Sequence, residues 1–317
     1  MVLLLILLSL SFNAFSLETD NYLSWKIDLD DSSQEINQFI ETQIKVALDR
    51  SNNKKTVQNC HEVTNEIASR FRAILVHHNP MENWLLKHLD SNQMYPSSQK
   101  HVEQSIYRNP MIFYIPAFGL SPNIQVNGIY FGMDKLTHFS STGRHYFNIF
   151  IRQKMNKKSD TDSAKSAIHY GLLDESTLHG HWASGVYSYA DLEANYQGLI
   201  FFKKFCHDEK NTYLRRNPDQ SWGLEQSPAI EDYVNPAWDE SYNNSFFLTK
   251  NWNKIAPVLE EEYCPLRNDP KIRRRFNKYD RVSKKSFSQR YIESLEKGKS
   301  IFTPREFNQS LEELCRN

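Results

Sequence analysis

Apolar residues recur three and four positions apart along most of this chain, and that spacing places them on one face of an α-helix. In the first such run, Ser32 and Glu35 form a capping-box pattern directly before the apolar positions. Pro80 stands where proline favours the first turn of another helix. The amino-terminal third therefore predicts helices over residues 32–48, 57–76, 80–89 and 99–107.

Three longer helical patterns follow in the middle of the chain. They cover residues 133–157, 162–178 and 189–206. Ser188 and Asp191 form a second capping-box pattern, which marks the start of the third helix. The connection at residues 179–187 is then short and bent, so we expect the three helices to pack as neighbours.

Other segments break the helical spacing. Asn127-Gly128 lies between alternating apolar residues, a pattern typical of a β-hairpin with a type I′ turn. Prolines bound residues 110–116, which predicts a non-helical segment that crosses the core. The central region thus combines helices with one small hairpin.

The carboxyl-terminal third is looser, because Asn-Pro and Ser-Pro pairs interrupt it. Helical patterns recur near residues 252–263 and 305–314. In the acidic and aromatic stretch at residues 235–240, we expect Trp238 to pack into the core; the alternative is a groove for a glycan or a peptide.

These patterns predict a mainly α fold, in which a core of three packed helices carries additional N- and C-terminal helices and a small β-hairpin. The corresponding regions are a signal peptide at residues 1–16, an N-terminal helical region at 17–123, a central helical core at 124–208 and a C-terminal accessory helical region at 209–317.

The first sixteen residues are apolar and end in small residues, Ala14 and Ser16, before a polar stretch, as in a secretory signal peptide. The usual basic residue at the start is missing, so an uncleaved anchor stays open, although about ten apolar residues are too few to span the ~30 Å hydrocarbon core. We expect export to the periplasm or cell surface. No other apolar run approaches the ~18 residues of a membrane span, so the mature chain is expected to have no transmembrane segment.

Charge is balanced, with 38 basic and 38 acidic residues, so no overall field favours nucleic acid. The basic stretch at residues 271–275 is expected to be a solvated face. Four cysteines lie far apart in the sequence and in no metal-type spacing: Cys60, Cys206, Cys264 and Cys315. They predict either two disulfides, for which three connectivities exist, or four buried thiols.

Candidate chemistry is concentrated in the three central helices, where polar residues four positions apart project from one helix face. The pairs are Asp134 with His138, Glu175 with His179, and Asp191 with Asn195. If the helices pack as neighbours, these faces converge on one polar pocket.

Three interpretations of this pocket stay open. In the first, Asp134, His138, Glu175 and His179 bind one divalent metal, either zinc, iron or manganese. In the second, catalysis is metal-free: desolvation raises the pKa of Glu175, which donates a proton, while Asp134 or Asp191 stays ionised. In the third, the carboxylates only cap helices and fasten them together.

Neighbouring residues add candidates for substrate binding. Lys135 follows Asp134 and would neutralise the pocket if it folded back, although a solvated lysine is the default expectation. Tyr187 ends the bent connection, and Asn195 lies in the third helix. Lys135, Tyr187 and Asn195 are therefore the predicted substrate contacts.

The pocket residues also form a motif. It reads Gly132-Met-Asp134-Lys135-Leu-Thr-His138-Phe139, then Glu175, then Ser188-Tyr-Ala-Asp191-Leu-Glu-Ala-Asn195-Tyr-Gln-Gly198. In order and spacing it resembles the motif shared by VanZ-like proteins and the small YfiM-type envelope lipoproteins, over residues 132–202. The resemblance implies a helical core and a cell-envelope setting, and it supplies no reaction. Because the helices here are polar, it implies a version that faces the envelope without being embedded in the membrane.

A looser resemblance is to lysozyme-like glycan hydrolases, in which a helix ends in a catalytic glutamate and a bent segment leads to the next helix. It implies Glu175 as general acid, with Asp191 or Tyr187 across the cleft. The leading hypothesis is an exported hydrolase that acts on an envelope component such as peptidoglycan, with or without a divalent metal. A non-enzymatic envelope binding or scaffold protein is the competing hypothesis.

Overall fold

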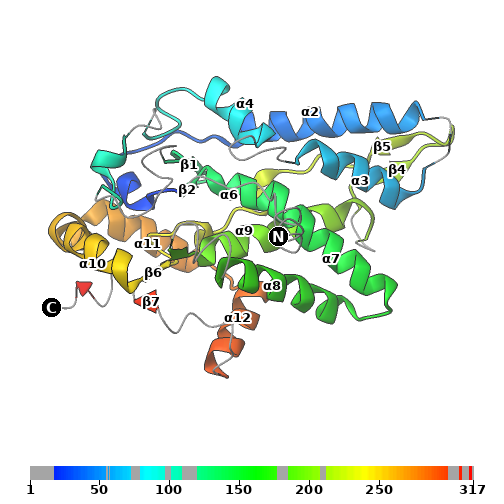
Figure 1. The fold of residues 1–317 in the computed structure, drawn as a ribbon. Helices are drawn as coiled ribbons and strands as arrows, with labels where there is room; N and C mark the ends of the chain where they lie inside the picture. Colours follow the sequence, from blue (N-terminus) through cyan, green and yellow to red (C-terminus); the bar gives the residue numbers. More distant parts are fainter. Residues whose placement is uncertain are drawn as a thin grey trace, which may run out of the picture.

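The computed structural model shows a mainly α protein, with helices stacked along its length and small two- and three-stranded sheets between them (Figure 1). The fold class predicted from the sequence is therefore confirmed. The structure describes residues 18–54, 56, 58–72, 79–96, 101–108, 120–176, 185–207, 212–298, 307–308 and 314–315. The predicted leader and the segment at 110–116 lie outside these ranges.

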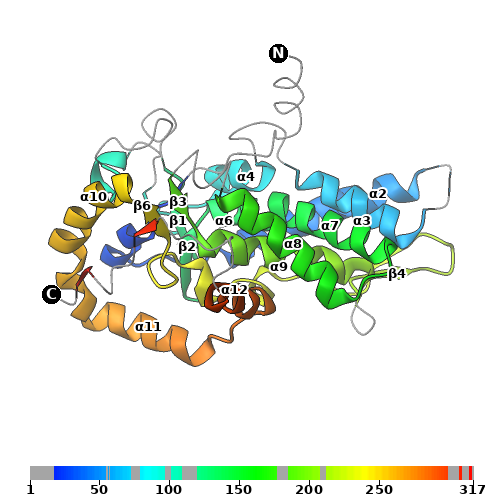
Figure 2. The same ribbon diagram turned by 60° about the horizontal axis from the view of Figure 1, so that its bottom comes forward.

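The central helices form the predicted core. They are α6 (Asp134–Thr137), the π-helical turn η3 (His138–Thr142), α7 (Gly143–Met155), α8 (Asp160–Ser176) and α9 (Tyr189–Cys206). The first three continue one another, so the single helix predicted over residues 133–157 is present but widens into a π-helical turn at His138. Helix α7 packs along both α8 and α9 (Figure 2). The bounds of α9 agree with the prediction.

Two glycines let this core close tightly. A Cβ atom added to Gly198 would lie 1.9 Å from the backbone oxygen of Phe139, and one added to Gly143 would lie 2.6 Å from the Cα of Gly198. Only hydrogen fits at these positions, so the backbones of η3 and α7 touch that of α9. This contact holds the helix that carries His138 against the helix that carries Asp191.

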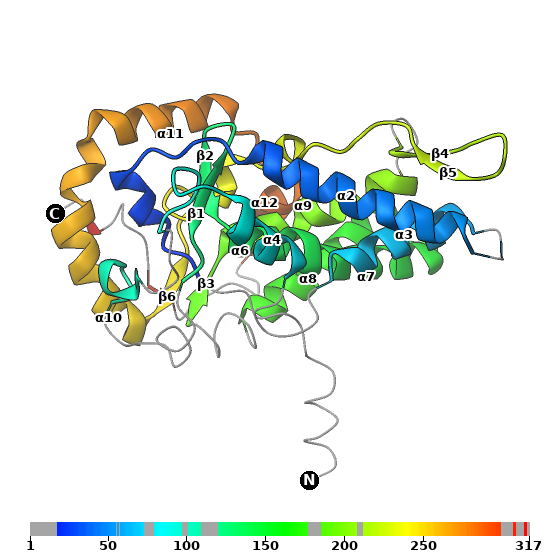
Figure 3. The same ribbon diagram turned by 90° about the horizontal axis from the view of Figure 1, so that it is seen from above.

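The N-terminal helices α2 (Ser33–Asn52) and α3 (Cys60–Arg70) run side by side along one edge, with α4 (Pro80–His88) near the start of α2 (Figure 3). The start of α2 agrees with the prediction, but Ser32 does not cap it; its hydroxyl instead donates to the carbonyl of Gln93 at 3.4 Å.

The second predicted helix was too long, because α3 is capped at Asn59 and ends before Phe71. The short helix predicted over residues 99–107 is only the 3₁₀ turn η2 (His101–Gln104).

The predicted hairpin is confirmed in β1 (Asn123–Val126) and β2 (Ile129–Gly132). Asn127 and Gly128 both have positive φ, 52° and 77°, as a type I′ turn requires. Strand β2 leads directly into α6 and so positions Asp134.

Two further small sheets complete the fold: β3 (Val186–Tyr187) with β6 (Phe246–Leu248) and β7 (Phe307–Asn308), and β4 (Leu214–Arg216) with β5 (Trp222–Leu224). The helix predicted over residues 305–314 is wrong at 307–308, where the chain pairs with β6 in the sheet instead.

The C-terminal region adds α10 (Thr249–Val258) with the π-helical turn η7 (Leu259–Tyr263), α11 (Pro270–Val282) and α12 (Phe287–Lys297). The first pair confirms the prediction over residues 252–263. The expected solvated basic face is confirmed at Arg273 and Arg274, which are exposed. It is wrong for Arg275, which is buried, donates to Ser24 and lies 3.6 Å from the ring centroid of Tyr130. Trp238 is fully buried in the core, as expected.

Two disulfides join distant segments. Cys60 pairs with Cys206, which ties α3 to the end of α9, and Cys264 pairs with Cys315. No helix in the described part of the chain combines the length and the apolar character needed to cross a bilayer.

Candidate functional site

Lys135 lies at the centre of a buried carboxylate cluster. Its side chain has no solvent exposure, and its Nζ atom lies 2.6 Å from Asp134 Oδ2, 2.7 Å from Asp191 Oδ1 and 2.8 Å from Glu240 Oε1. The ammonium therefore forms ion pairs with three carboxylates, and it donates a hydrogen bond to Asp134. The default expectation of a solvated Lys135 is wrong: because three acids converge on it, the lysine folds inward.

His138 links the same cluster to α9 through both ring nitrogens. Nδ1 lies 3.2 Å from Asn195 Oδ1, and Nε2 lies 3.3 Å from Asp191 Oδ2. An amide oxygen only accepts hydrogen bonds, so Nδ1 donates its hydrogen to Asn195. Nε2 therefore faces the Asp191 carboxylate either with a second proton or with its lone pair.

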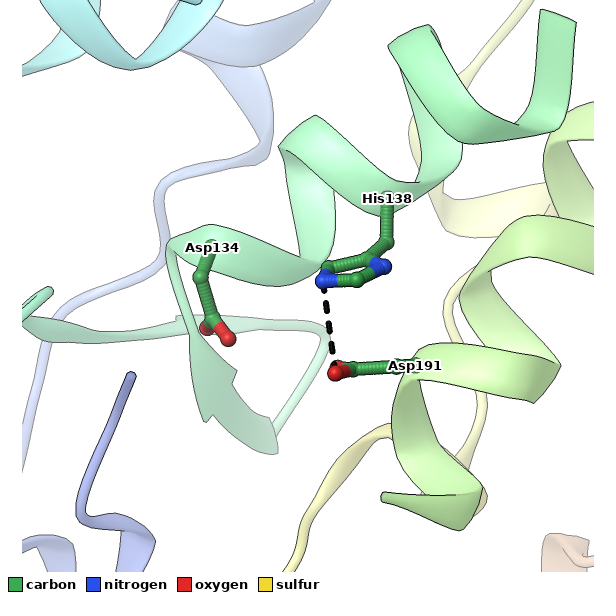
Figure 4. A group of neighbouring side chains, drawn as sticks. All are labelled: Asp134, His138 and Asp191. Carbon is green, nitrogen blue, oxygen red and sulfur yellow. Dashed lines mark ion pairs between the residues drawn. The ribbon is translucent and has the colours of Figure 1, made fainter. Parts of the chain in front are cut away.

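The side chains of Asp134, His138 and Asp191 point toward one another from α6, η3 and α9 (Figure 4). Asp134 is further fixed by Thr19, whose hydroxyl donates to Oδ1 at 2.7 Å. Because Lys135 holds Oδ2, both oxygens of Asp134 have partners. The predicted convergence of the first and third helical pairs is thus present.

Solvent reaches this cluster at one edge. The exposed fraction of the side chain is 13% for His138 and 11% for Asp191, against 2% for Asp134 and 6% for Glu240. Of these four side chains, His138 and Asp191 are therefore the more exposed.

The charges in the cluster push carboxyl pKa values in opposite directions. Burial would raise the pKa of Asp191, but the nearby His138 and Lys135 charges and the hydrogen bonds from Lys135 and Ser188 lower it overall. Burial, opposed in part by Lys135, raises the pKa of Glu240 to about 7. Asp191 is therefore the ionised carboxylate at the open edge.

Glu175, at the end of α8, is 3% exposed and lies near the backbone N–H of Ser188, at 3.5 Å. Burial, and then repulsion from Asp191, raises its pKa well above the usual range. Its predicted partner His179 lies outside the described residues, so the second helical pair is seen only in part.

The predicted substrate contacts occupy different places. Asn195 orients His138, whereas Lys135 and Tyr187 are both fully buried. Tyr187 packs edge-on against Tyr189, with ring centroids 5.4 Å apart. Neither Lys135 nor Tyr187 presents a surface to solvent.

One group of ligand-type side chains in the described part of the chain can hold a metal ion. It consists of Asp134, His138 and Asp191, whose ligand atoms all lie within 4.8 Å of one another. Glu175 is not a member of this group; Asp191 joins Asp134 and His138 instead. The separation of His138 Nε2 and Asp191 Oδ2 suits two ligands of one tetrahedral ion, which are about 3.4 Å apart when each bond is near 2.1 Å.

Sequence reasoning missed several members of the site, because they come from distant segments. Thr19 and Glu18 lie in the first described residues, and Glu240 lies in the stretch considered only for its tryptophan. Burial, with repulsion from Glu240 and Asp191, raises the pKa of Glu18 to about 8. The only sequence signal for Glu240 is its place in the acidic stretch at residues 235–240.

In comparisons with known proteins, no family model, no curated protein and no solved structure matches the chain. A function can therefore be inferred only from the residues of the site.

Proposed function

We propose that this chain is an exported hydrolase of the bacterial cell envelope, in which His138 and Asp191 hold a divalent metal at the open edge of the cluster. The observation that carries the proposal is the 3.3 Å approach of His138 Nε2 to Asp191 Oδ2, at the point where solvent reaches the cluster. Zinc, iron and manganese all accept imidazole and carboxylate ligands.

The ring orientation favours a cation over a free histidine base. Nδ1 is bound to Asn195, so only Nε2 is left to act, and it faces a carboxylate rather than an open space. A metal-bound histidine typically has this arrangement, in which its second nitrogen donates to a fixed oxygen. Asn195 then fixes the orientation of the His138 ring, and Lys135 fixes the Asp191 carboxylate through its Oδ1 atom.

A bound divalent metal would polarise a carbonyl or phosphoryl group and lower the pKa of its water ligand. The chain's own residues prepare the place for it. Lys135 offsets one carboxylate charge among Asp134, Asp191 and Glu240, the last of which is partly protonated at neutral pH, so negative charge remains to attract a cation. Both carboxylate oxygens of Asp134 already have partners, Thr19 and Lys135. Asp134 would therefore be a weaker ligand of the metal than His138 and Asp191.

The envelope setting rests on other observations. Two disulfides are typical of an oxidising compartment outside the cytoplasm. The leader pattern and the resemblance of residues 132–202 to envelope proteins favour the same location. Peptidoglycan is the polymer we propose as substrate.

A metal-free glycan hydrolase is the second candidate, favoured by one observation. The pKa of Glu175 is raised by burial and by repulsion from Asp191, while that of Asp191 is lowered by His138 and Lys135, so the two carboxyl groups interact and are shifted toward the acid and the ionised form, respectively. Two carboxyl groups in these states are what glycoside hydrolysis uses. In this version Glu175 protonates the leaving oxygen.

Incubation of the protein with purified peptidoglycan sacculi tests the function. We expect soluble fragments, and a fall of at least about a hundredfold in their release for His138→Asn and Asp191→Asn. His169→Asn is the matched control, because this histidine lies on α8 and contacts Tyr291 instead of the cluster. New reducing ends would indicate the glycan version, and new amino groups a peptide bond. If the wild-type protein releases nothing from sacculi, with or without added metal, the proposed substrate is wrong.

A further inference from the structure

Helix α9 has a second polar face. Asp191 and Asn195 lie on the face of α9 that contacts Lys135 and His138. Tyr189 precedes Asp191 by two positions, and Glu193 precedes Asn195 by two, so both lie about 200° around the helix from that face. On that opposite side, α9, α12 and the segment before β6 line a half-open cavity of about 300 Å³. It has the size of a small-ligand site.

The lining of this cavity is acidic. Glu193, Glu293 and Glu296 contribute to it, and Glu293 forms an ion pair with Lys285, which does not itself line the cavity. Phe246 and Ile292 supply apolar surface. The ring of Phe246 packs edge-on against Tyr189, with centroids 5.3 Å apart, which gives the cavity one aromatic wall.

Glu193 is 1% exposed and has only neutral partners. It accepts hydrogen bonds from Gln197 at 2.7 Å, Asn235 at 3.0 Å and Ser286 at 2.6 Å. No basic side chain in the described part of the chain forms an ion pair with it. A buried carboxylate without a cation is costly, and burial accordingly raises the pKa of Glu193.

One more polar group at the cavity lacks a partner, and two of the carboxyl groups there lie close together. The buried hydroxyl of Ser288, which also lines it, has no hydrogen-bond partner among the described residues. Glu293 and Glu296 lie three positions apart on α12, and their mutual repulsion contributes, after burial, to the raised pKa of Glu296. Tyr189 donates its hydroxyl hydrogen to Glu296 and thereby fixes that carboxyl at the wall.

We propose that this cavity binds a primary ammonium group carried on a short carbon chain, such as the side chain of a basic amino acid in a peptide. The ammonium would donate to the glutamates, and the carbon chain would lie against Phe246 and Ile292. Asn243 and Asn244 offer amide groups to a peptide backbone. An amine on a phospholipid fits less well, because its phosphate would meet the carboxyl groups of Glu193 and Glu296.

Calorimetric titration with Nα-acetyl-lysine amide tests the proposal. We expect saturable binding, and none with Nα-acetyl-norleucine amide, which has a similar chain without the ammonium. Glu296→Gln should weaken binding about tenfold or more, because a charge-assisted hydrogen bond is lost while the glutamine oxygen still accepts from Tyr189. Glu261→Gln is the control, since that side chain is 78% exposed and outside the cavity.

The proposal is overturned if the lysine amide does not bind, if the norleucine amide binds equally well, or if Glu296→Gln leaves binding unchanged. Binding to phosphatidylethanolamine vesicles in preference to the lysine amide would also overturn it. The assay measures no turnover and Glu296 is not part of the His138 cluster, so its result is independent of the proposed hydrolase.

Discussion

The Nε2 atom of His138 lies 3.3 Å from Oδ2 of Asp191, although the two residues come from different helices. Asn195 holds the other nitrogen of the ring, and Lys135 holds the other oxygen of the carboxylate. The orientations of both side chains are thus fixed by other residues. Nε2 of His138 and Oδ2 of Asp191 face each other where the buried cluster is most exposed to solvent. The proposed metal site depends on this relationship.

Removal of the buried ammonium should destabilise the fold. In Lys135→Met, Asp134, Asp191 and Glu240 lose their shared cation, and breaking a buried charge pair in this way costs about 3 to 5 kcal/mol. Urea denaturation measures the change. Lys278→Met is the control, because that lysine is exposed and donates to the carbonyl of Asn127 instead of to the cluster. Equal stability of the two variants would show that Lys135 does not hold the cluster together.

Asn195 should act on metal binding through His138. Asn195→Ala removes the acceptor that fixes Nδ1, and the loss of such a partner typically lowers metal affinity about 10- to 100-fold. Competition with a chromophoric chelator measures the affinity. In Gln197→Ala, which loses a bond to Glu193 on the other face of α9, the affinity should be that of the wild type. A result in which Asn195→Ala binds metal normally contradicts the assigned ring orientation.

The contact of α9 with η3 should tolerate no side chain at Gly198. The methyl group of Gly198→Ala would fall 1.9 Å from the backbone oxygen of Phe139, so the helices must move apart. We expect a loss of about 1 to 3 kcal/mol in the free energy of unfolding, as in other overpacked cores. Gly223→Ala is the control, since its nearest neighbour would be 3.3 Å away, at the side-chain nitrogen of Asn217. Similar melting temperatures for both variants would rule out the tight contact.

Asp20 should make stability depend on pH. Burial raises its pKa from 3.8 to about 7, although the backbone N–H groups of Ile106 and Tyr22 oppose the rise. The folded state therefore keeps a proton that the unfolded state releases, and stability falls as pH rises from about 4 to 7. Each pKa unit corresponds to about 1.4 kcal/mol. Thermal melts at pH 5 and pH 8 should differ less for Asp20→Asn than for the wild type; an unchanged difference contradicts this role.

The sequence was most informative where local signals agree. Ser188 accepts a hydrogen bond from the backbone of Asp191, so the start of α9 is marked by its own residues. The positive φ values of Asn127 and Gly128 are likewise a local requirement of the turn. The four-residue spacing also correctly predicted that the pair Asp134 and His138 would meet the pair Asp191 and Asn195, because α9 packs against η3.

The rest of the site depends on contacts between distant segments. Lys135 is buried because Asp191 and Glu240 reach it from other parts of the chain, and nothing within its own helix indicates that. The π-helical turn at His138 was also missed, since its apolar spacing resembles that of an ordinary helix. Tertiary packing decided these features.

Elemental analysis of protein purified without chelators tests the central claim most directly. The account predicts about one equivalent of zinc, iron or manganese per folded wild-type chain, and its loss in His138→Ala, while His169→Ala keeps it. Thermal melts of all three proteins show that each is folded. A folded wild-type protein that takes up none of these metals, even after dialysis against each, would contradict a metal site at His138 and Asp191.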